Sequence, residues 1–147
     1  MRSKVSIIAF CFLNIYYCYA QKRVVQKATD KIKVLDTLSY LKTFEANKKE
    51  YIGKKFSYLL AKMDKIQPQT VWSVPNSMDS MVVAKSLFRF YDTNYPIMNE
   101  TKMLITWEKG LPYKTVSFNN QRNKFYFSES ERRYYETRIV KNILVYR

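Results

Sequence analysis

The chain has 147 residues and a formal net charge of +14, from 26 Lys and Arg against 12 Asp and Glu. It contains no His, which excludes His-based catalytic triads, proton relays and imidazole metal sites. Only two Gly are present, so there is neither a dinucleotide-binding glycine fingerprint nor a phosphate-binding loop. A hydrophobic fraction of 47% is ample for a core, and the length suits one domain.

The first 20 residues have the three-part pattern of a secretory signal peptide. Arg2 and Lys4 give a positive start, residues 7–19 are mainly apolar, and a polar stretch follows Ala20. The apolar part is shorter than the roughly 17 to 25 residues that span a bilayer, so a cleaved chain would not be membrane-spanning. We expect export and cleavage after Ala20, with a periplasmic or extracellular protein as the product. An uncleaved anchor and a lipoprotein acylated at Cys18 are the alternatives.

Cleavage would change the chemistry available to the mature chain. Cys11 and Cys18 both lie in the leader, so the remainder has no thiol nucleophile, disulfide or cysteine-bound zinc. The rest of the chain contains no linker-like composition and no internal repeat. We expect a basic N-terminal arm at residues 21–35, which a short strand would also fit, and a single domain at residues 36–147.

Two helices are predicted at the start of this domain. Asp36-Thr37 is a suitable N-cap for the first, whose apolar residues recur at three-residue spacing. Gly53 stands where a helix would end in a left-handed conformation. Residues 56–63 show the clearest amphipathic pattern in the chain and predict the second helix, which Pro68 would end.

The middle of the chain reads as strands. Residues 70–74 are rich in β-branched and aromatic side chains, and residues 81–91 form a long apolar run after a polar turn. Residues 92–100 predict a loop. Residues 103–107 alternate between buried and partly wet positions, and Gly110-Leu111-Pro112 is expected to end this strand.

The C-terminal part completes an α+β prediction. Residues 113–121 fit a helix or a strand, and residues 125–127 a short strand or an extended bridge. Residues 128–138 begin with the Ser-x-x-Glu spacing of a capping box and predict a helix, and residues 143–146 predict a final strand. We expect N-terminal helices and one C-terminal helix packed on a small, mainly antiparallel sheet. The expected core residues are Leu41, Phe44, Phe56, Leu59, Leu60, Met63, Trp72, Ile105, Trp107, Ile139, Ile143 and Val145.

Packing and turn residues at both ends of the domain carry a likeness to known sequences. These residues are Tyr51-Ile52-Gly53-Lys54, Phe56-Ser57, Leu59-Leu60, Phe125-Tyr126-Phe127, Ser128 with Glu131, and Ile139-Val140-Lys141-Asn142-Ile143. On them the chain resembles small exported hypothetical proteins of Bacteroidota. The resemblance implies export and a small α+β domain, and it implies no activity, cofactor or catalytic residue.

Paired carboxylates are the leading catalytic chemistry for a chain without His, ahead of a Ser–Lys dyad, because the segment around Ser57 is typical of a helix surface. Glycoside hydrolysis needs a carboxylic acid and a second carboxylate roughly 5 to 9.5 Å apart. The candidates lie beside Lys or Arg or at helix starts, where solvation or capping accounts for them: Glu45, Glu50, Asp64, Glu108, Glu129 and Glu131. Ser57 and Ser128 lack a nucleophile-elbow sequence and a His base. We assign no catalytic, cofactor-binding or metal-binding residue, and keep a carboxylate-dependent cell-envelope polysaccharide hydrolase as the alternative function.

The strong positive charge predicts anionic partners by long-range attraction. Outside the cytoplasm these would be lipopolysaccharide, anionic lipid headgroups, acidic polysaccharide or extracellular DNA. Intracellular nucleic acid is not expected, because of the leader and because no nucleic-acid-binding signature is present. Six residues clustered in sequence are the candidate contacts: Lys48, Lys49, Lys54, Lys55, Arg132 and Arg133. A generally solvated lysine-rich surface is the other interpretation. We expect a non-enzymatic exported binding or accessory protein of the cell envelope.

Overall fold

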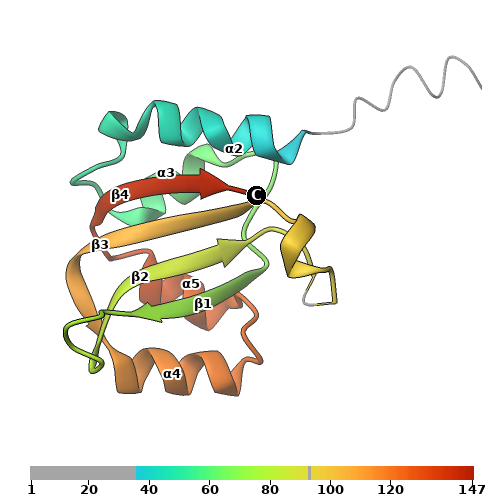
Figure 1. Ribbon diagram of the computed structural model, residues 1–147. Helices are drawn as coiled ribbons and strands as arrows, with labels where there is room; N and C mark the ends of the chain where they lie inside the picture. Colours follow the sequence, from blue (N-terminus) through green and yellow to red (C-terminus); the bar gives the residue numbers. More distant parts are fainter. Residues whose placement is uncertain (1–35, 93) are drawn as a thin grey trace, which may run out of the picture. The chain divides into compact units, whose positions relative to one another are not determined.

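Four strands form one antiparallel sheet in the order β1-β2-β3-β4 (Figure 1). The strands are β1 (Thr70–Pro75), β2 (Val82–Arg89), β3 (Lys102–Pro112) and β4 (Val140–Tyr146). The structure is a computed structural model that describes residues 36–92 and 94–147. The expected signal peptide at 1–20 and basic arm at 21–35 lie outside the described residues.

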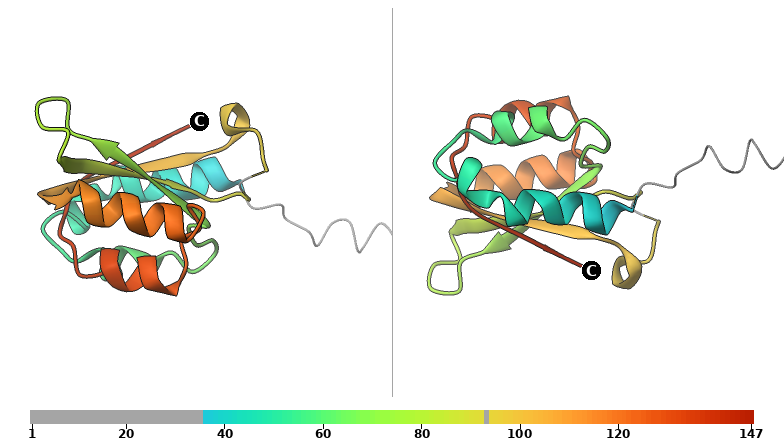
Figure 2. Two further views of the ribbon diagram at one scale, coloured as in Figure 1. Left: turned by 90° about the horizontal axis from the view of Figure 1, so that it is seen from below. Right: turned by 90° about the horizontal axis from the view of Figure 1, so that it is seen from above.

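Helices cover one face of this sheet. They are α2 (Thr37–Ala46), α3 (Phe56–Lys62), α4 (Tyr113–Arg122) and α5 (Glu129–Tyr135), with the short turns η1 (Lys48–Glu50) and η2 (Ile97–Asn99). Both views of Figure 2 place α3 and α5 on the same side of the strands, with α2 beside the β4 edge and α4 beside the β1 edge. The α+β prediction is confirmed.

The local signals for the first helix act as predicted. The carboxylate of Asp36 accepts a hydrogen bond from the backbone N–H of Ser39, which satisfies one of the free donors at the start of α2. Gly53 has a φ of +79°, a left-handed conformation that a side chain disfavours. The chain reverses there and begins α3.

Alternate strand residues point toward the helices and form the core. Val71, Phe88, Met103 and Val145 lie opposite one another across the four strands, and all are buried. This period of two is the geometry of a strand with one covered face. All but two of the expected core residues are buried. Trp72 and Ile139 are only partly covered, because Trp72 points to the opposite face of the sheet and Ile139 lies just before β4.

Gly110-Leu111-Pro112 does not end β3, which corrects the sequence-based expectation. β3 continues to Pro112, and Val83 pairs with Leu111 after an irregularity in β2. A Cβ atom on Gly110 would lie 2.1 Å from Cγ1 of Val82, so a residue without a side chain allows the two strands to approach. Gly110 is a packing residue of the strand.

Two helix ends also differ from the sequence patterns, and one ambiguous segment is resolved. α3 ends at Lys62, before Pro68, and α5 ends at Tyr135. Residues 113–122 are the helix α4, which resolves the ambiguity of that segment. At the start of α5 the Ser128 hydroxyl donates to the carboxylate of Glu131 and caps no backbone N–H, so the capping-box spacing marks the helix start through a different bond.

Neighbouring segments cover part of both sheet edges. On β1, the N–H of Val71 donates to the carbonyl of Phe125 (2.9 Å). On β4, the N–H of Gly53 donates to the carbonyl of Val140 (2.8 Å), whose own N–H donates to Lys54 (3.0 Å). These bonds occupy strand groups that would otherwise template pairing with another chain. The face of the sheet without helices keeps exposed positions such as Lys85 and Leu144.

Leu60→Ala should destabilise the domain by about 2 to 5 kcal/mol, because it leaves a cavity among α3 and its neighbours. Leu60 is only 3% exposed and belongs to the continuous core. Urea unfolding measures the change. Leu144→Ala is the control, since it removes an equal number of atoms at an exposed position of β4. An unchanged midpoint for Leu60→Ala would contradict the assigned helix face.

Alkaline pH should unfold the domain through buried tyrosine. The ring of Tyr135 stacks on Trp107, with centroids 5.5 Å apart, and the residue is only 1% exposed. Burial raises the pKa of the Tyr135 phenol above its ordinary value of 10.0. Above pH 10 the unfolded chain ionises this group while the folded state holds it neutral. Stability present below pH 10 is therefore lost as the pH rises, by up to about 1.4 kcal/mol per pH unit.

Urea unfolding between about pH 8 and 11 tests this dependence. Tyr135→Phe should make the alkaline loss of stability less steep. Tyr113→Phe removes a hydroxyl at an exposed position and serves as the control. Equal alkaline slopes in wild type and Tyr135→Phe would show that ionisation of Tyr135 does not drive the loss.

Candidate binding face

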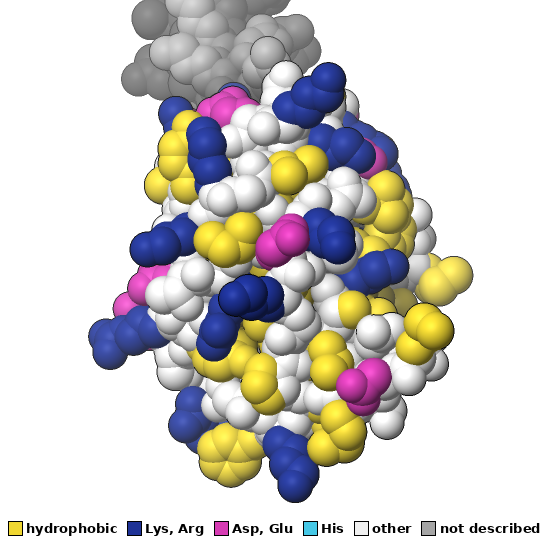
Figure 3. Space-filling model, turned by 90° about the vertical axis from the view of Figure 1, so that its left-hand side faces the viewer, with side chains coloured by type: hydrophobic (Ala, Val, Ile, Leu, Met, Phe, Trp, Pro, Cys, Tyr) yellow, Lys and Arg dark blue, Asp and Glu magenta, His cyan; other side chains and the backbone are white. Residues whose placement is uncertain are grey.

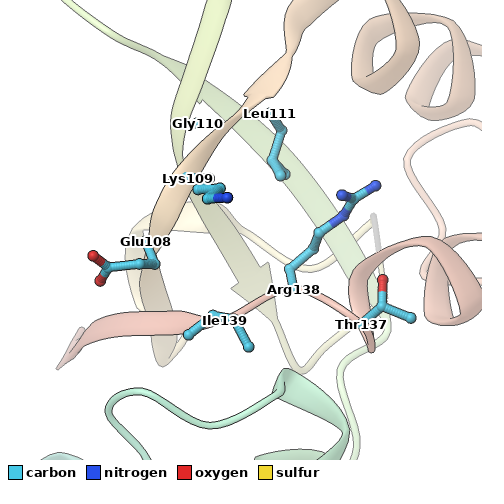
Figure 4. A pocket seen from close by; sticks show the side chains of 7 residues that line it. All are labelled: Glu108, Lys109, Gly110, Leu111, Thr137, Arg138 and Ile139. Carbon is cyan, nitrogen blue, oxygen red and sulfur yellow. The ribbon is translucent and has the colours of Figure 1, made fainter.

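A shallow hollow of about 210 Å³ lies where β3 approaches the chain between α5 and β4 (Figure 4). Seven residues line it: Glu108, Lys109, Gly110, Leu111, Thr137, Arg138 and Ile139. It is smaller than the roughly 300 to 1,000 Å³ of typical ligand pockets. Glu108 is the one carboxylate of the lining, and in Figure 4 its side chain points away from the others. The hollow thus lacks the second carboxylate that glycoside hydrolysis requires.

The remaining candidate carboxylates are engaged by neighbouring side chains. The partners are Lys42 for Glu45, Tyr58 for Glu50, Tyr40 for Asp64, Arg133 for Glu129, and Ser128 and Asn123 for Glu131. No group of three or more Asp, Glu, Cys or His in the described ranges is arranged to hold a metal ion. A carboxylate-dependent hydrolase stays a prediction that none of these contacts favours.

The six candidate polyanion contacts fall into two separate groups. The four lysines lie before α3: Lys48 and Lys49 in η1, and Lys54 and Lys55 in the turn that follows. The two arginines lie on α5, and Arg132 donates to Gln67 (2.8 Å), beyond the other end of α3.

Several of these cations already have contacts. Lys48 donates to Asn142 (3.1 Å), the ammonium of Lys54 lies 4.1 Å from the centroid of the Tyr58 ring, and Arg133 pairs with Glu129. Figure 3 shows Lys and Arg side chains spread among acidic and hydrophobic ones on the face in view. The six basic residues that cluster in the sequence therefore do not form one basic patch on the surface.

The face of the sheet opposite the helices presents a distinct surface, here called the outer face (Figure 1). It consists of twelve residues at the regularly paired strand positions that alternate with the core residues: Thr70, Trp72, Val74, Lys85, Leu87, Arg89, Lys102, Leu104, Thr106, Asn142, Leu144 and Tyr146. None of them is Asp or Glu. In the described part of the chain no helix packs on this face (Figure 2).

A row of apolar residues crosses the middle of the outer face. Trp72, Leu87, Leu104 and Leu144 lie opposite one another on the four strands, and each is at least partly exposed. At the β1 end the indole ring of Trp72 stacks on Phe125, with centroids 4.3 Å apart and planes 13° apart. An apolar row across an uncovered sheet face is typical of an interaction surface.

A buried ion pair closes one end of the outer face. The guanidinium of Arg89 bonds the carboxylate of Glu100 and also donates to the carbonyl of Tyr95 (3.3 Å). Arg89 is 3% exposed and Glu100 is fully buried. The second carboxylate oxygen of Glu100 has no hydrogen-bond partner among the described residues. The pair neutralises Arg89, so it contributes no net charge to the face.

Lys102 lies next to this pair and keeps its charge uncompensated. Only 9% of its surface is exposed. Its ammonium donates to the carbonyl oxygen of Glu100 (3.4 Å) and lies 5.7 Å from the centroid of the Tyr146 ring. The described ion pairs are those of Glu45, Glu100 and Glu129, so no described carboxylate pairs with Lys102. A largely buried lysine without a carboxylate partner favours an anionic ligand.

Two exposed apolar turns lie at the ends of the sheet and are here called the apolar tips. The first is the β1–β2 turn with Met78 and Met81, and the second is η2 with Ile97 and Met98. In both views of Figure 2 the two turns extend away from α3 and α5, on the side of the outer face. Met78 is 94% exposed and Met98 81% exposed. The outer face therefore lies between two apolar projections.

Sequence reasoning missed Lys102 because it searched for basic residues that are neighbours in the chain. The available signal was the alternation of residues 102–107, which places Lys102, Leu104 and Thr106 on one side of a strand. That signal shows which residues share a face. It does not show that Trp72, Leu87 and Leu144 join them, since the strand register is a tertiary property.

Among the helices of the described residues, none has the length and hydrophobicity to cross a membrane.

Comparisons with known proteins do not assign the chain to a family. The resemblance to exported proteins of Bacteroidota stays a prediction. No family model, no curated protein and no solved structure matches the chain.

Proposed function

We propose that the domain is a non-enzymatic binding protein that holds an anionic, partly apolar partner against its outer face. The observation that carries the proposal is Lys102, a nearly buried cation without a carboxylate partner beside a partly exposed apolar row. Anionic groups of the partner would contact Lys102 and the exposed Lys85. Its apolar part would cover Leu104 and Leu144.

Both halves of this recognition have a physical basis. Contact with the apolar row removes hydrocarbon from water and contributes roughly 25 cal/mol per Å². An anion at Lys102 gains a hydrogen bond to a charged group, worth about 1.5 to 3 kcal/mol. The twelve positions of the outer face contain no Asp or Glu, and Glu108, the one acidic residue of the four strands, lies beyond them on β3. Export to the cell envelope, predicted from the first 20 residues, would bring the domain to surfaces rich in such groups.

Titration with decyl phosphate below its micelle concentration tests the proposal, with backbone NMR shifts as the readout. We expect the largest shifts on the outward positions of β2, β3 and β4. Lys102→Gln should weaken binding about tenfold, since loss of one charged hydrogen bond is worth at least 1.4 kcal/mol. Lys85→Gln should weaken it less. A melting curve of each variant checks that the fold is kept.

Lys49→Gln is the matched control, because Lys49 is an exposed lysine in η1, far from β3 in sequence and outside the outer face. It should leave the affinity for decyl phosphate unchanged. If the shifts instead gather at residues 48–55 and Lys49→Gln weakens binding as much as Lys102→Gln, the lysines before α3 form the contact surface and the outer face does not.

A further inference from the structure

We infer that the partner of the outer face is the surface of an anionic lipid bilayer, which the two apolar tips enter. This inference rests on the proposed function and names its partner. It draws on features that binding of a small anion does not require, namely the position and exposure of the tips.

The apolar tips carry Met78 and Met98, the two most exposed large hydrophobic side chains of the described residues. Both tips extend on the side of the outer face. Single exposed apolar residues are ordinary on protein surfaces. Here Met78, Met81, Ile97 and Met98 are gathered on two turns that extend in the same direction (Figure 2). Methionine is unbranched and adapts to irregular apolar surroundings, such as lipid chains. Two separate projections fit a bilayer, which accepts both at once.

Aromatic residues lie on the outer face and beside η2. Trp72 and Tyr146 belong to the outer face, and Tyr95 stacks on Tyr91 beside η2, with centroids 4.6 Å apart. Trp72, Tyr95 and Tyr146 are at least partly exposed. Trp and Tyr favour the boundary between lipid chains and headgroups, because one part of each ring system is apolar and another is polar. Tyr95 and Tyr146 would lie at this boundary when the tips are inserted, whereas the indole N–H of Trp72 is buried and only apolar parts of its ring can meet the lipid.

The charges near this surface favour anionic lipids. Lys85 and Lys102 face the partner, and each basic residue near an anionic bilayer is worth about 1 kcal/mol. Asp79 and Asp92 are the exposed acidic residues of the two connecting loops, since Glu100 is buried against Arg89. Each accepts a backbone hydrogen bond in its own turn, from Met81 (2.9 Å) and Asn94 (3.0 Å) respectively. These carboxylates shape the turns, although their charge reduces the attraction.

Other occupants fit these observations less well. A protein partner would bury a central cluster of anchoring residues, whereas the most exposed apolar residues here lie at the two ends. A second copy of the chain would bring Lys102 and Lys85 against the same cations. The basic segment at residues 21–35 would meet like charge as well. A soluble acidic protein remains as an outcome that the experiment distinguishes.

Quenching of tryptophan by brominated lipid tests the inference with the full chain. The protein has two tryptophans: Trp72 on the outer face and Trp107, buried in the core. Vesicles of phosphatidylcholine and phosphatidylglycerol with brominated acyl chains should quench the emission of the wild type. Trp72→Phe should abolish the quenching. Vesicles of phosphatidylcholine alone should quench far less, and added salt should weaken the effect.

The tips are tested by a double variant, Met78→Ser with Met98→Ser. It should raise the lipid concentration for half-maximal quenching at least tenfold, because each buried methionine contributes about 1.5 to 3 kcal/mol. Phe118→Ser is the matched control, since it removes an exposed apolar side chain from α4. Equal effects of the two variants, or quenching that persists in Trp72→Phe, would overturn the inference.

The remaining outcomes separate this inference from the proposed function. Decyl phosphate shifts on the outer face without quenching by anionic vesicles would retain the binding face and reject the bilayer. Poly-L-glutamate tests an acidic protein as the partner. If it shifts the NMR signals of the outer face equally in the wild type and in the Met78/Met98 variant, the partner is an acidic protein and the bilayer is rejected. Decyl phosphate shifts elsewhere would reject the proposed function itself.

Discussion

Glu100→Gln should destabilise the domain by about 3 to 5 kcal/mol, because it leaves the guanidinium of Arg89 buried without a carboxylate. Both residues are almost completely inaccessible to water, and the Nε atom of Arg89 bonds Glu100 directly. The amide of Gln can still accept a hydrogen bond, but it carries no charge to balance the guanidinium. Urea unfolding of the variant measures the loss.

Replacing both members of the pair distinguishes the cost of an unpaired charge from a loss of packing. Arg89→Met combined with Glu100→Leu should recover most of the stability, since neither charge is then buried. Arg133→Gln is the control at an exposed pair, where the expected change is below about 1 kcal/mol. A loss for Glu100→Gln as small as that of Arg133→Gln would mean that water reaches Arg89 and that the pair is not buried in solution.

The elements with one clear period were predictable from sequence. The helix α3 follows from the spacing of Phe56, Leu59, Leu60 and Met63, whose side chains all enter the core. The strand β3 follows from the alternation that begins at Met103. In both cases the period of the apolar residues indicates that one face of the element is buried, and packing against the core requires that burial.

Gly110 and the helix α4 show what local patterns could not provide. Gly and Pro near one another usually mark a break, yet β3 runs through them because Val82 of the adjacent strand needs the space above Gly110. α4 has few apolar residues, and among its side chains only Val116 and Asn120 are buried. The apolar residues of α4 have a weak period because the helix packs at the β1 edge of the sheet and buries little of its surface.

The candidate site depended on contacts between residues distant in sequence. Arg89 and Glu100 belong to opposite sides of the β2–β3 connection, and Trp72 meets Phe125 across the β1 edge. The four lysines that cluster in the sequence lie in η1 and the turn before α3, and the two arginines lie apart from them on α5. The cation without a carboxylate partner is Lys102, a single lysine in β3. Its lack of a partner is evident only from the structure, which shows that the nearby Glu100 pairs with Arg89.

Phe88→Ala should destabilise the domain by about 3 to 5 kcal/mol, the range for truncation of a buried aromatic ring. The Phe88 ring is fully buried and meets four other rings. The centroid distances are 4.8 Å to Phe56, 5.4 Å to Phe127, 5.6 Å to Tyr135 and 6.3 Å to Trp107. Urea unfolding gives the free energy, and Phe118→Ala on the surface of α4 is the control, with an expected change within about 0.5 kcal/mol.

The position of Phe88 explains why this cavity cannot close. Its neighbours come from α3, β3 and α5, and from the segment before α5, so a shift of any one toward the space would break contacts it makes elsewhere. A cavity that persists costs more than one that collapses. Phe88→Leu leaves a smaller space and should cost less than Phe88→Ala. Equal costs would show that the ring contacts, and not the volume, determine the contribution of this residue.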